Sequence, residues 1–278
     1  MLTMQTLGRW GRLGNQMFQY AALKGISVMH DYNMLIPQHY KVEVPDQVYE
    51  LFKAFRLINL KTSETCPVHQ WPRMQRQIRI PQFEYQKNIV ENLLPNTDIS
   101  GSYCQSWKYF DNVKDLIRQD FEFNFDVISK VKPFVESQSQ PFFLNVRRGD
   151  YLKYKDHHPT LPLSYYQEAL KKFDNTNTCI IVSDDVKWCK ENFKQSNVVF
   201  TDELGKLPGY YDMAIMSLCN GGIMANSTFA WWGAWLQKNR TNPIITPNLS
   251  ISGPGGWFGP ANKYNTDDLL LDDWIQLK

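Results

Sequence analysis

Several features that would settle a function at once are missing from these 278 residues. Lys and Arg number 30 against 28 Asp and Glu, which leaves a net charge of only +2, and no block of like charge occurs. A nucleic acid is therefore not expected as a partner. No run of 18 apolar residues occurs, so no transmembrane segment is predicted, and the first residues lack the apolar stretch of a signal peptide.

Cysteine is also scarce. The five cysteines are scattered, and no two of them form a CxxC pair. This pattern indicates neither a disulfide framework nor a zinc site, and it suits a reducing cytoplasm. Hydrophobic residues make up 43% of the chain and aromatic residues 14%, so a folded protein of about two domains is expected.

The order of the apolar segments divides the chain in two. Ser129–Gln140, which contains Pro133, is interpreted as a linker, so we expect an N-terminal domain over residues 1–135 and a C-terminal domain over 136–278. In the C-terminal domain, strands are expected at 142–146, 179–182, 198–200, 222–225 and 243–246, and helices at 164–173, 186–193, 211–218 and 227–236. This alternation predicts an α/β fold with a doubly wound parallel sheet.

Two adjacent arginines follow the first of these strands. The run FFLNVRRGDY places Arg147 and Arg148 at the carboxyl end of the strand, where open α/β sheets bind ligands. A guanidinium group matches phosphate oxygens two at a time, and Asp150 could hold one arginine in its working rotamer. A solvated loop, or an ion pair with Asp150, is the alternative.

Two later strand ends also carry polar groups. Asp184 and Asp185 follow the second strand and allow three interpretations. They could bind a purine edge or a ribose, they could be a metal-binding diacid, or they could be an ordinary pair at a helix N-cap. Ser227, Thr228 and Phe229 open a helix whose first backbone N–H groups could seat a phosphate, although Ser-Thr is also a common N-cap.

The N-terminal domain has one comparable place. A short strand at residues 2–7 leads into a glycine-rich turn that ends at Gly14, and Asn15 is expected to cap a helix reaching residue 30. Backbone N–H groups at such a turn favour anions. Towards the other end of the chain, the loop Gly253–Gly259 is expected to be a flexible lid.

Four motifs together resemble the α-1,2-fucosyltransferases: GRLGNQMFQYA (11–21), NVRRGDY (145–151), SDD (183–185) and ANSTFAWWGAWL (225–236). They occur in the family's order over nearly the whole chain. The resemblance implies a GT-B-like fold, in which two Rossmann-like domains face a cleft and the C-terminal one binds GDP-fucose. It also implies inverting transfer of L-fucose, without metal or other cofactor, to a hydroxyl of a glycan acceptor, usually the 2-OH of a terminal galactose.

The resemblance also assigns residues. Arg147, as partner of the β-phosphate, and Asn15, beside the transferred sugar, are the catalytic candidates. More distant relatives, the α-1,6- and protein O-fucosyltransferases, seat phosphate on a Ser-Thr-Phe motif and read guanine with an acidic residue that matches Asp184. The donor-binding candidates are Gly14, Asn145, Arg148, Asp150, Asp184, Ser227, Thr228 and Phe229.

One position departs from the family pattern, and one role stays open. Asn145 stands where the family usually has His; either its side chain or its backbone touches the base, and we favour the backbone because the arginines that follow are intact.

The general base that an inverting displacement needs stays open between Asp150, Glu50 and the pair His157-His158.

Two other classes of function remain on the residues alone. A non-catalytic nucleotide-sugar binding protein would bind the donor without turnover, and a metal-dependent GT-A transferase would use Asp184 and Asp185. For the fucosyltransferase we expect a galactoside-containing glycan as acceptor and a cytoplasmic location, at the inner face of a membrane where the acceptor is lipid-linked.

Overall fold

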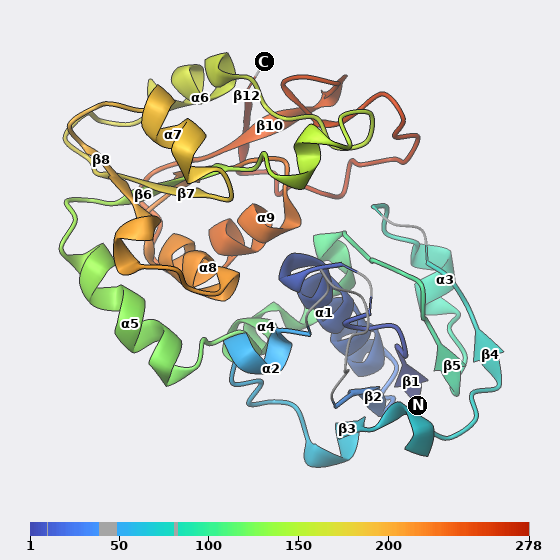
Figure 1. Ribbon diagram of the computed structural model, residues 1–278. Coiled ribbons are helices and arrows are strands. Elements are labelled where there is room, and N and C mark those ends of the chain that lie inside the picture. Colours follow the sequence, from blue (N-terminus) through green and yellow to red (C-terminus); the bar gives the residue numbers. More distant parts are fainter. Residues whose placement is uncertain (10, 39–48, 81–82, 278) are drawn as a thin grey trace. The chain divides into compact units, whose positions relative to one another are not determined.

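The structure, a computed structural model that describes residues 1–9, 11–38, 49–80 and 83–277, consists of two compact α/β units (Figure 1). The first unit contains Met1–Asn124 and Tyr264–Leu271, and the second contains Phe125–Lys263 and Asp272–Lys278. Within the part of the chain so described, no helix is both long and apolar enough to span a membrane.

The interpretation of Ser129–Gln140 as a linker is wrong over most of its length. Helix α5 (Phe125–Glu136) runs through it and belongs to the second unit. Val127, Val131 and Val135 recur every four residues and are buried, which is the stripe of an amphipathic helix. The expected boundary between residues 135 and 136 thus falls at the end of this helix.

The first unit is built on a sheet of short parallel strands in the order β3-β2-β1-β5-β4. Its strands are β1 (Leu2–Thr3), β2 (Met34–Pro37), β3 (Thr65–Cys66), β4 (Arg76–Gln77) and β5 (Thr97–Asp98). Its α-helices are α1 (Leu13–Met29), α2 (Leu51–Ala54), α3 (Lys87–Glu91) and α4 (Lys114–Asp120), and its 3₁₀ turns are Thr62–Glu64, Val68–Gln70, Trp107–Tyr109 and Asp111–Val113.

Helix α1 is the core of the first unit. Residues from Leu13 to Ser27 are buried all round, with the single exception of Asn15, so the helix has no solvent face there. Gly25 is required, because a Cβ at that position would lie 2.1 Å from the Tyr109 carbonyl oxygen. The predicted N-cap is wrong: the helix starts two residues before Asn15, and Arg12 occupies the cap position without a side-chain hydrogen bond.

The second unit is a doubly wound parallel sheet, as predicted. Its strands run in the order β11-β10-β9-β6-β7-β8, with β12 beside β10. They are β6 (Phe142–Val146), β7 (Cys179–Ser183), β8 (Val198–Phe200), β9 (Gly222–Ile223), β10 (Ile244–Ser252), β11 (Gly256–Phe258) and β12 (Ile275–Leu277). The other helices are α6 (Leu163–Leu170), α7 (Val186–Asn192), α8 (Gly209–Leu218) and α9 (Thr228–Trp235), with 3₁₀ turns at Asp150–Leu152 and Thr201–Leu204.

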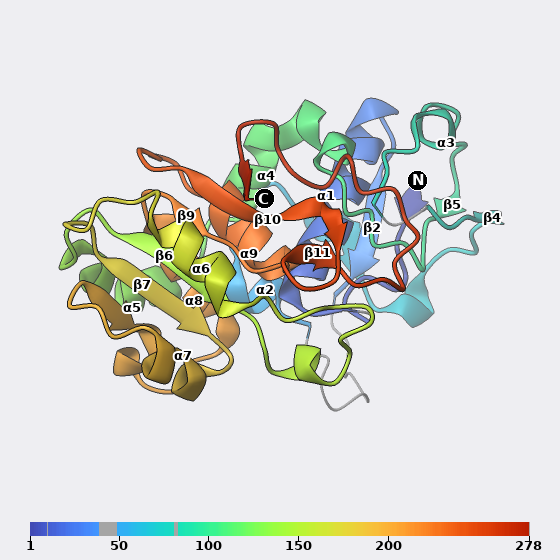
Figure 2. The same ribbon diagram turned by 90° about the horizontal axis from the view of Figure 1, so that it is seen from above.

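Helices cover both faces of this sheet (Figures 1 and 2). Helices α6 and α7 lie on one face, and α5, α8 and α9 lie on the other. Successive side chains of β6 point to opposite faces of the sheet. Phe142, Leu144 and Val146 point to the face covered by α6 and α7 and pack in the cluster formed with these helices. Each such buried side chain contributes roughly 1.5–3 kcal/mol relative to exposure. The packing of α6 and α7 on β6 therefore extends to Val146, the residue before Arg147.

Candidate active site at the strand ends of the second unit

The site lies where the strand order of the second sheet reverses. β6 has β7 on one side and β9 on the other, so the chain winds outward in both directions from this pair of neighbours. Ligands of open α/β sheets bind outside the carboxyl ends at such a point. Parallel pairing of β9, β6 and β7 brings together the three motifs that follow them, at Arg147, Asp184 and Asn226.

Arg147 is held by two carboxylates. One terminal nitrogen lies 2.5 Å from Asp150 Oδ1, and the other lies 2.6 Å from Asp184 Oδ2. The guanidinium also sits 5.2 Å from the centre of the Tyr151 ring. A guanidinium carries five N–H groups, more than two carboxylates use, so the head group is fixed and keeps donors for a further anion.

The side chain and the backbone of Arg148 are also held by several contacts. Its Nε donates to Asp185 Oδ2 over 3.0 Å, its backbone N–H donates to Asp184 Oδ1 over 2.9 Å, and its guanidinium stacks 4.3 Å from the Trp188 ring centre. Gly149 makes this possible, because a Cβ there would lie 2.7 Å from Asp184 Oδ2.

The other oxygen of Asp185 caps α7 by accepting the Trp188 N–H over 3.2 Å. The two aspartates are thus occupied by arginine and backbone donors. Within the described ranges, no group of three or more His, Cys, Asp or Glu side chains is placed to hold a metal ion.

Asn226 ties three segments together. Its side-chain nitrogen donates to the backbone carbonyls of Pro159, over 2.9 Å, and Trp257, over 3.0 Å. Its backbone carbonyl accepts a hydrogen bond from the Tyr151 hydroxyl over 3.0 Å. Burial raises the pKa of Tyr151 to about 12, so its hydroxyl keeps the proton that it donates. The Tyr151 ring stacks on His158.

The glycine-rich loop is more ordered than a lid. Gly256–Phe258 forms β11, which pairs with β10, and Trp257 is buried. The loop also bonds to a neighbouring segment, since the Gly259 N–H donates to the His157 carbonyl over 3.0 Å. The expectation of a flexible lid is therefore wrong for this stretch.

The start of α9 matches the predicted motif in position. Ser227 is the N-cap, and its hydroxyl accepts the Phe229 N–H over 3.2 Å. Thr228 is the first residue of the helix. A phosphate bound here would compete with the Ser227 hydroxyl for the Phe229 N–H. The roles of Ser227, Thr228 and Phe229 in binding the donor stay predictions.

Asn145 faces inward. Its side chain is 95% buried, its nitrogen donates to the Val182 carbonyl over 3.2 Å, and its oxygen has no hydrogen-bond partner among the described residues. Helix α6 contacts the chain just after β9, because the Tyr165 hydroxyl donates to the Met224 carbonyl over 2.8 Å.

The remaining two predicted residues, Gly14 and Asn15, lie in the first unit. Asn15 Oδ1 accepts the side-chain amide of Gln105 over 2.5 Å, and the Asn15 amide nitrogen packs against Gly11, which has φ +83°. Gly14 is buried in the first turn of α1. The Asn15 amide is thus oriented by Gln105, with its oxygen occupied.

Reasoning from sequence missed the contacts of Tyr151 and Asn226 at the site, and the buried carboxyl group of Asp212 away from it. Tyr151 and Asn226 adjoin predicted residues, but only tertiary contacts show their role. Asp212 is half-buried in the first turn of α8, and burial raises its pKa to about 6 against the opposing hydrogen bond from Thr201. Burial therefore disfavours the charged form of this carboxyl group, which bears on stability rather than on the site.

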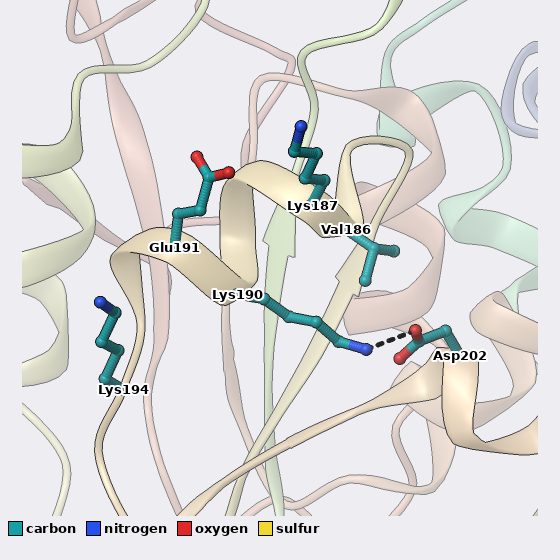
Figure 3. Close-up of a pocket in the computed structure, with 6 residues that line it drawn as sticks. All are labelled: Val186, Lys187, Lys190, Glu191, Lys194 and Asp202. Carbon is teal, nitrogen blue, oxygen red and sulfur yellow. Dashed lines mark hydrogen bonds and ion pairs between the residues drawn. The ribbon is translucent and has the colours of Figure 1, made fainter.

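A surface hollow of about 480 Å³ lies elsewhere, on the outer side of α7 (Figure 3). Lys190 crosses it to pair with Asp202 over 2.6 Å. It is lined by Val186, Lys187, Lys190, Glu191, Lys194 and Asp202, none of which is a predicted site residue.

Comparison with known proteins identifies relatives over the whole chain. The O-antigen biosynthesis glycosyltransferase WbnK of Escherichia coli is 27% identical over 96% of this chain and 98% of its own. An alpha-1,2-colitosyltransferase of the same organism is 27% identical over 96% and 97%. Galactoside alpha-(1,2)-fucosyltransferase 1 of Bos taurus is 27% identical over 97% of this chain and 75% of its own.

Solved structures share the fold. Fucosyltransferase NodZ from Bradyrhizobium aligns with a TM-score of 0.58 at 15% identity, over 91% of this chain and 96% of its own. POFUT1 in complex with GDP-fucose aligns with a TM-score of 0.57 at 12% identity, over 88% and 96%. The predicted GT-B-like α/β fold with two parallel sheets is confirmed.

The resemblance drawn from the motifs is confirmed as well. A family model described as glycosyl transferase family 11 matches residues 2–254 and so spans both units. This chain is a member of glycosyl transferase family 11.

Proposed function

We propose that this glycosyltransferase moves L-fucose from GDP-fucose to the 2-OH of a terminal galactose in a glycan acceptor, with inversion at the anomeric carbon. The observation that carries the proposal is Arg147, fixed by Asp150 and Asp184 at the switch point of the sheet. The names of the relatives, which include galactoside alpha-(1,2)-fucosyltransferases, support the acceptor.

Breaking the bond between fucose and the diphosphate builds negative charge on the leaving group and positive charge on the sugar. Arg147 stabilises the leaving β-phosphate through N–H groups that are already oriented, which removes the cost of arranging them during the reaction. The Asn15 amide, held by Gln105, adds a donor beside the transferred sugar. Arg148, Asp184 and the start of α9 bind the rest of the donor.

The reaction needs no metal ion in this proposal. A cation would have to displace the arginines from Asp184 and Asp185, whose oxygens already accept from Arg147, Arg148 and the α7 backbone. Arginines and helix N-termini serve instead as the positive groups that meet the diphosphate.

The test is turnover by the purified protein. We expect GDP-fucose with a panel of β-galactosides to give a product heavier by one deoxyhexose in mass spectrometry, with the linkage at the 2-OH. Excess EDTA should leave the rate unchanged. Binding of GDP-fucose without product contradicts an enzyme, and a rate abolished by EDTA and restored by manganese contradicts the metal-free mechanism.

The donor sugar has a specific rival. Because one relative is an alpha-1,2-colitosyltransferase, activated colitose is offered in parallel. A higher kcat/KM for colitose than for fucose would reassign the donor and leave the site unchanged.

A further inference from the structure

Tyr151 lies in the 3₁₀ turn that follows β6, and its ring contacts Arg147. Asp150 Oδ1 and Asp184 Oδ2 accept from the two terminal nitrogens of Arg147, over 2.5 and 2.6 Å. The N–H groups of a guanidinium lie in its plane, so these two bonds hold the group within that plane. The Tyr151 ring centre lies 5.2 Å from the guanidinium carbon, within the range of a cation–π contact. The ring thus limits the motion out of the plane that the carboxylates leave open.

Tyr151 is itself held at other points. Its hydroxyl donates to the Asn226 backbone carbonyl over 3.0 Å, and its ring stacks on His158 with 5.0 Å between the ring centres and 20° between the planes. The turn that carries it is closed onto the end of β6, because the Leu152 N–H donates to the Arg148 carbonyl over 2.9 Å. The place of the ring is therefore set by contacts other than the one with the guanidinium.

The hydroxyl connects Arg147 to the start of α9. Asn226 directly precedes Ser227, the N-cap of that helix. Arg147 follows β6 and Asn226 follows β9, and these two strands are neighbours in the sheet. Tyr151 contacts both of the segments that leave them, one through its ring and the other through its hydroxyl. A change at Tyr151 should therefore alter the separation between the guanidinium and the first N–H groups of α9.

We propose that Tyr151 is a positioning residue that holds the Arg147 guanidinium in the orientation, and at the distance from the start of α9, that a bound diphosphate requires. The inference rests on the proposed function, in which Arg147 contacts the β-phosphate and the start of α9 helps to bind the donor. Tyr151 acts through Arg147 and needs no contact of its own with the donor. The competing role is packing alone, in which the ring only fills space beside His158.

The nucleotides GDP and GMP separate positioning from packing, because only GDP has the β-phosphate that Arg147 is proposed to contact. Isothermal titration calorimetry gives the Kd of each nucleotide. For Tyr151→Leu, which removes both the ring and the hydroxyl, we expect the Kd of GDP to rise by about tenfold and that of GMP to stay within about twofold. Tyr151→Phe keeps the ring and loses the bond to the Asn226 carbonyl, so the Kd of GDP should rise by roughly threefold.

Tyr165→Phe is the matched control. The Tyr165 hydroxyl donates to the Met224 carbonyl over 2.8 Å, so this variant also removes a tyrosine hydroxyl bond to the chain between β9 and α9. The Tyr165 ring packs in the hydrophobic cluster formed with α6 and α7. We expect a lower melting temperature and an unchanged ratio of the two Kd values.

A double variant shows whether Tyr151 acts through Arg147. Arg147→Ala should bind GDP about as weakly as the wild type binds GMP. Adding Tyr151→Leu should then change the Kd of GDP by less than about twofold, because the group that Tyr151 positions is gone. Additive losses would overturn the proposal, as would a Tyr151→Leu variant in which both Kd values are unchanged or rise equally.

Tyr151→Phe decides where the Leu variant does not fold. A rise in Kd confined to GDP supports the positioning role, and no rise, or an equal rise for GMP, contradicts it. Wild-type protein that binds neither GDP nor GDP-fucose would instead remove the proposed function on which the inference rests.

Discussion

At the scale of single residues, the site is organised by charge. Arg147 and Arg148 face Asp150, Asp184 and Asp185, so two positive charges meet three negative ones and the group carries a formal charge of −1 before a ligand binds. A diphosphate therefore gains from directed N–H bonds rather than from net positive charge. Geometry matters more here than the number of charges.

This argument predicts the behaviour of Arg147 variants. Arg147→Ala should remain folded, because the two carboxylates that it leaves are partly exposed, at 39% for Asp150 and 26% for Asp184. Its kcat should fall by roughly 10²–10³-fold. Arg147→Lys should also be poor, since an ammonium cannot bridge two carboxylates and a phosphate in one plane. Steady-state kinetics beside a thermal melt decide, and near-full activity of the Lys variant would contradict the bidentate role.

Asn145 tests whether a buried side chain reads the base. Because its amide nitrogen is used by the Val182 carbonyl within the sheet, we expect Asn145→His to leave KM for GDP-fucose within a few-fold. Overpacking of a 95% buried position should at the same time lower the free energy of unfolding by about 1–3 kcal/mol. A tenfold change in KM, about 1.4 kcal/mol, would show that the Asn145 side-chain oxygen, which has no partner among the described residues, contacts the base.

Asp212 makes stability depend on pH. Its pKa is raised from 3.8 to about 6 by burial, so the folded state disfavours the charged form, and stability is lost as pH rises from about 4 to about 6. Asp212→Asn should therefore raise the free energy of unfolding above pH 6, by on the order of 1 kcal/mol, and should change little near pH 4. Urea unfolding at pH 4 and pH 7.5 measures the difference, and a variant less stable than wild type at pH 7.5 contradicts the sign.

At the scale of elements, strands with continuous apolar runs were predictable and contacts between distant segments were not. β6 and β8 have the predicted bounds, because Phe142–Val146 and Val198–Phe200 are short apolar runs between turn residues. α5 was missed because Pro133 and its polar neighbours obscured a stripe of three valines. The two-residue strands of the first unit are too short for any alternation to show.

The candidate site divides in the same way. The arginines, the aspartates and Ser227 were predictable, since each follows an apolar run. The pairing of Arg147 with Asp150 was also anticipated, since the two are three residues apart. The second carboxylate on Arg147, that of Asp184, and the bonds of Asn226 to Pro159 and Trp257 were not, because they join segments up to 67 residues apart.

Asn226 is hydrogen-bonded to Pro159, Trp257 and Tyr151, so a substitution at this residue should separate the segments that it connects. Asn226→Asp keeps the shape of the side chain but replaces the donor by oxygens that repel the Pro159 and Trp257 carbonyls. The segments 156–160 and 253–259 should then loosen and be cut faster in limited proteolysis, and kcat/KM should fall through KM for the donor. Asn92→Asp, at the exposed C-cap of α3, where the side chain bonds only locally to the Asn88 carbonyl, is the control, and equal proteolysis of both variants would exclude the coupling.

At the scale of the whole molecule, the division into units does not follow the order of the chain. Tyr264–Leu271 returns to the first unit, where Asp268 accepts the Tyr85 N–H over 2.8 Å and pairs with Lys108. The chain then ends in the second unit, where Trp274 packs on Trp231 at 5.4 Å between ring centres. Since a packed surface connection is not marked by hydrophobic periodicity, this return could not be predicted from the sequence.

The two units give the donor proposal a test that needs no acceptor. If GDP binds the strand ends of the second unit, it stabilises that unit by RT ln(1 + [L]/Kd), about 2.7 kcal/mol at a hundredfold excess over Kd. Amides of the second unit that exchange through its unfolding should slow by about a hundredfold, with strong protection at residues 146–152, 183–186 and 226–230. Amides of the sheet around β1 and β5 should change much less.

Hydrogen exchange read by mass spectrometry, with and without GDP, measures this difference directly. Arg147→Ala is the control and should lose most of the protection, because its N–H groups are the proposed contacts of the β-phosphate. Protection confined to residues 11–18, or spread equally over both units in the wild type and the variant, would place the nucleotide elsewhere. Protection centred on the outer side of α7 would move the donor site to the hollow beside Lys190 and Asp202.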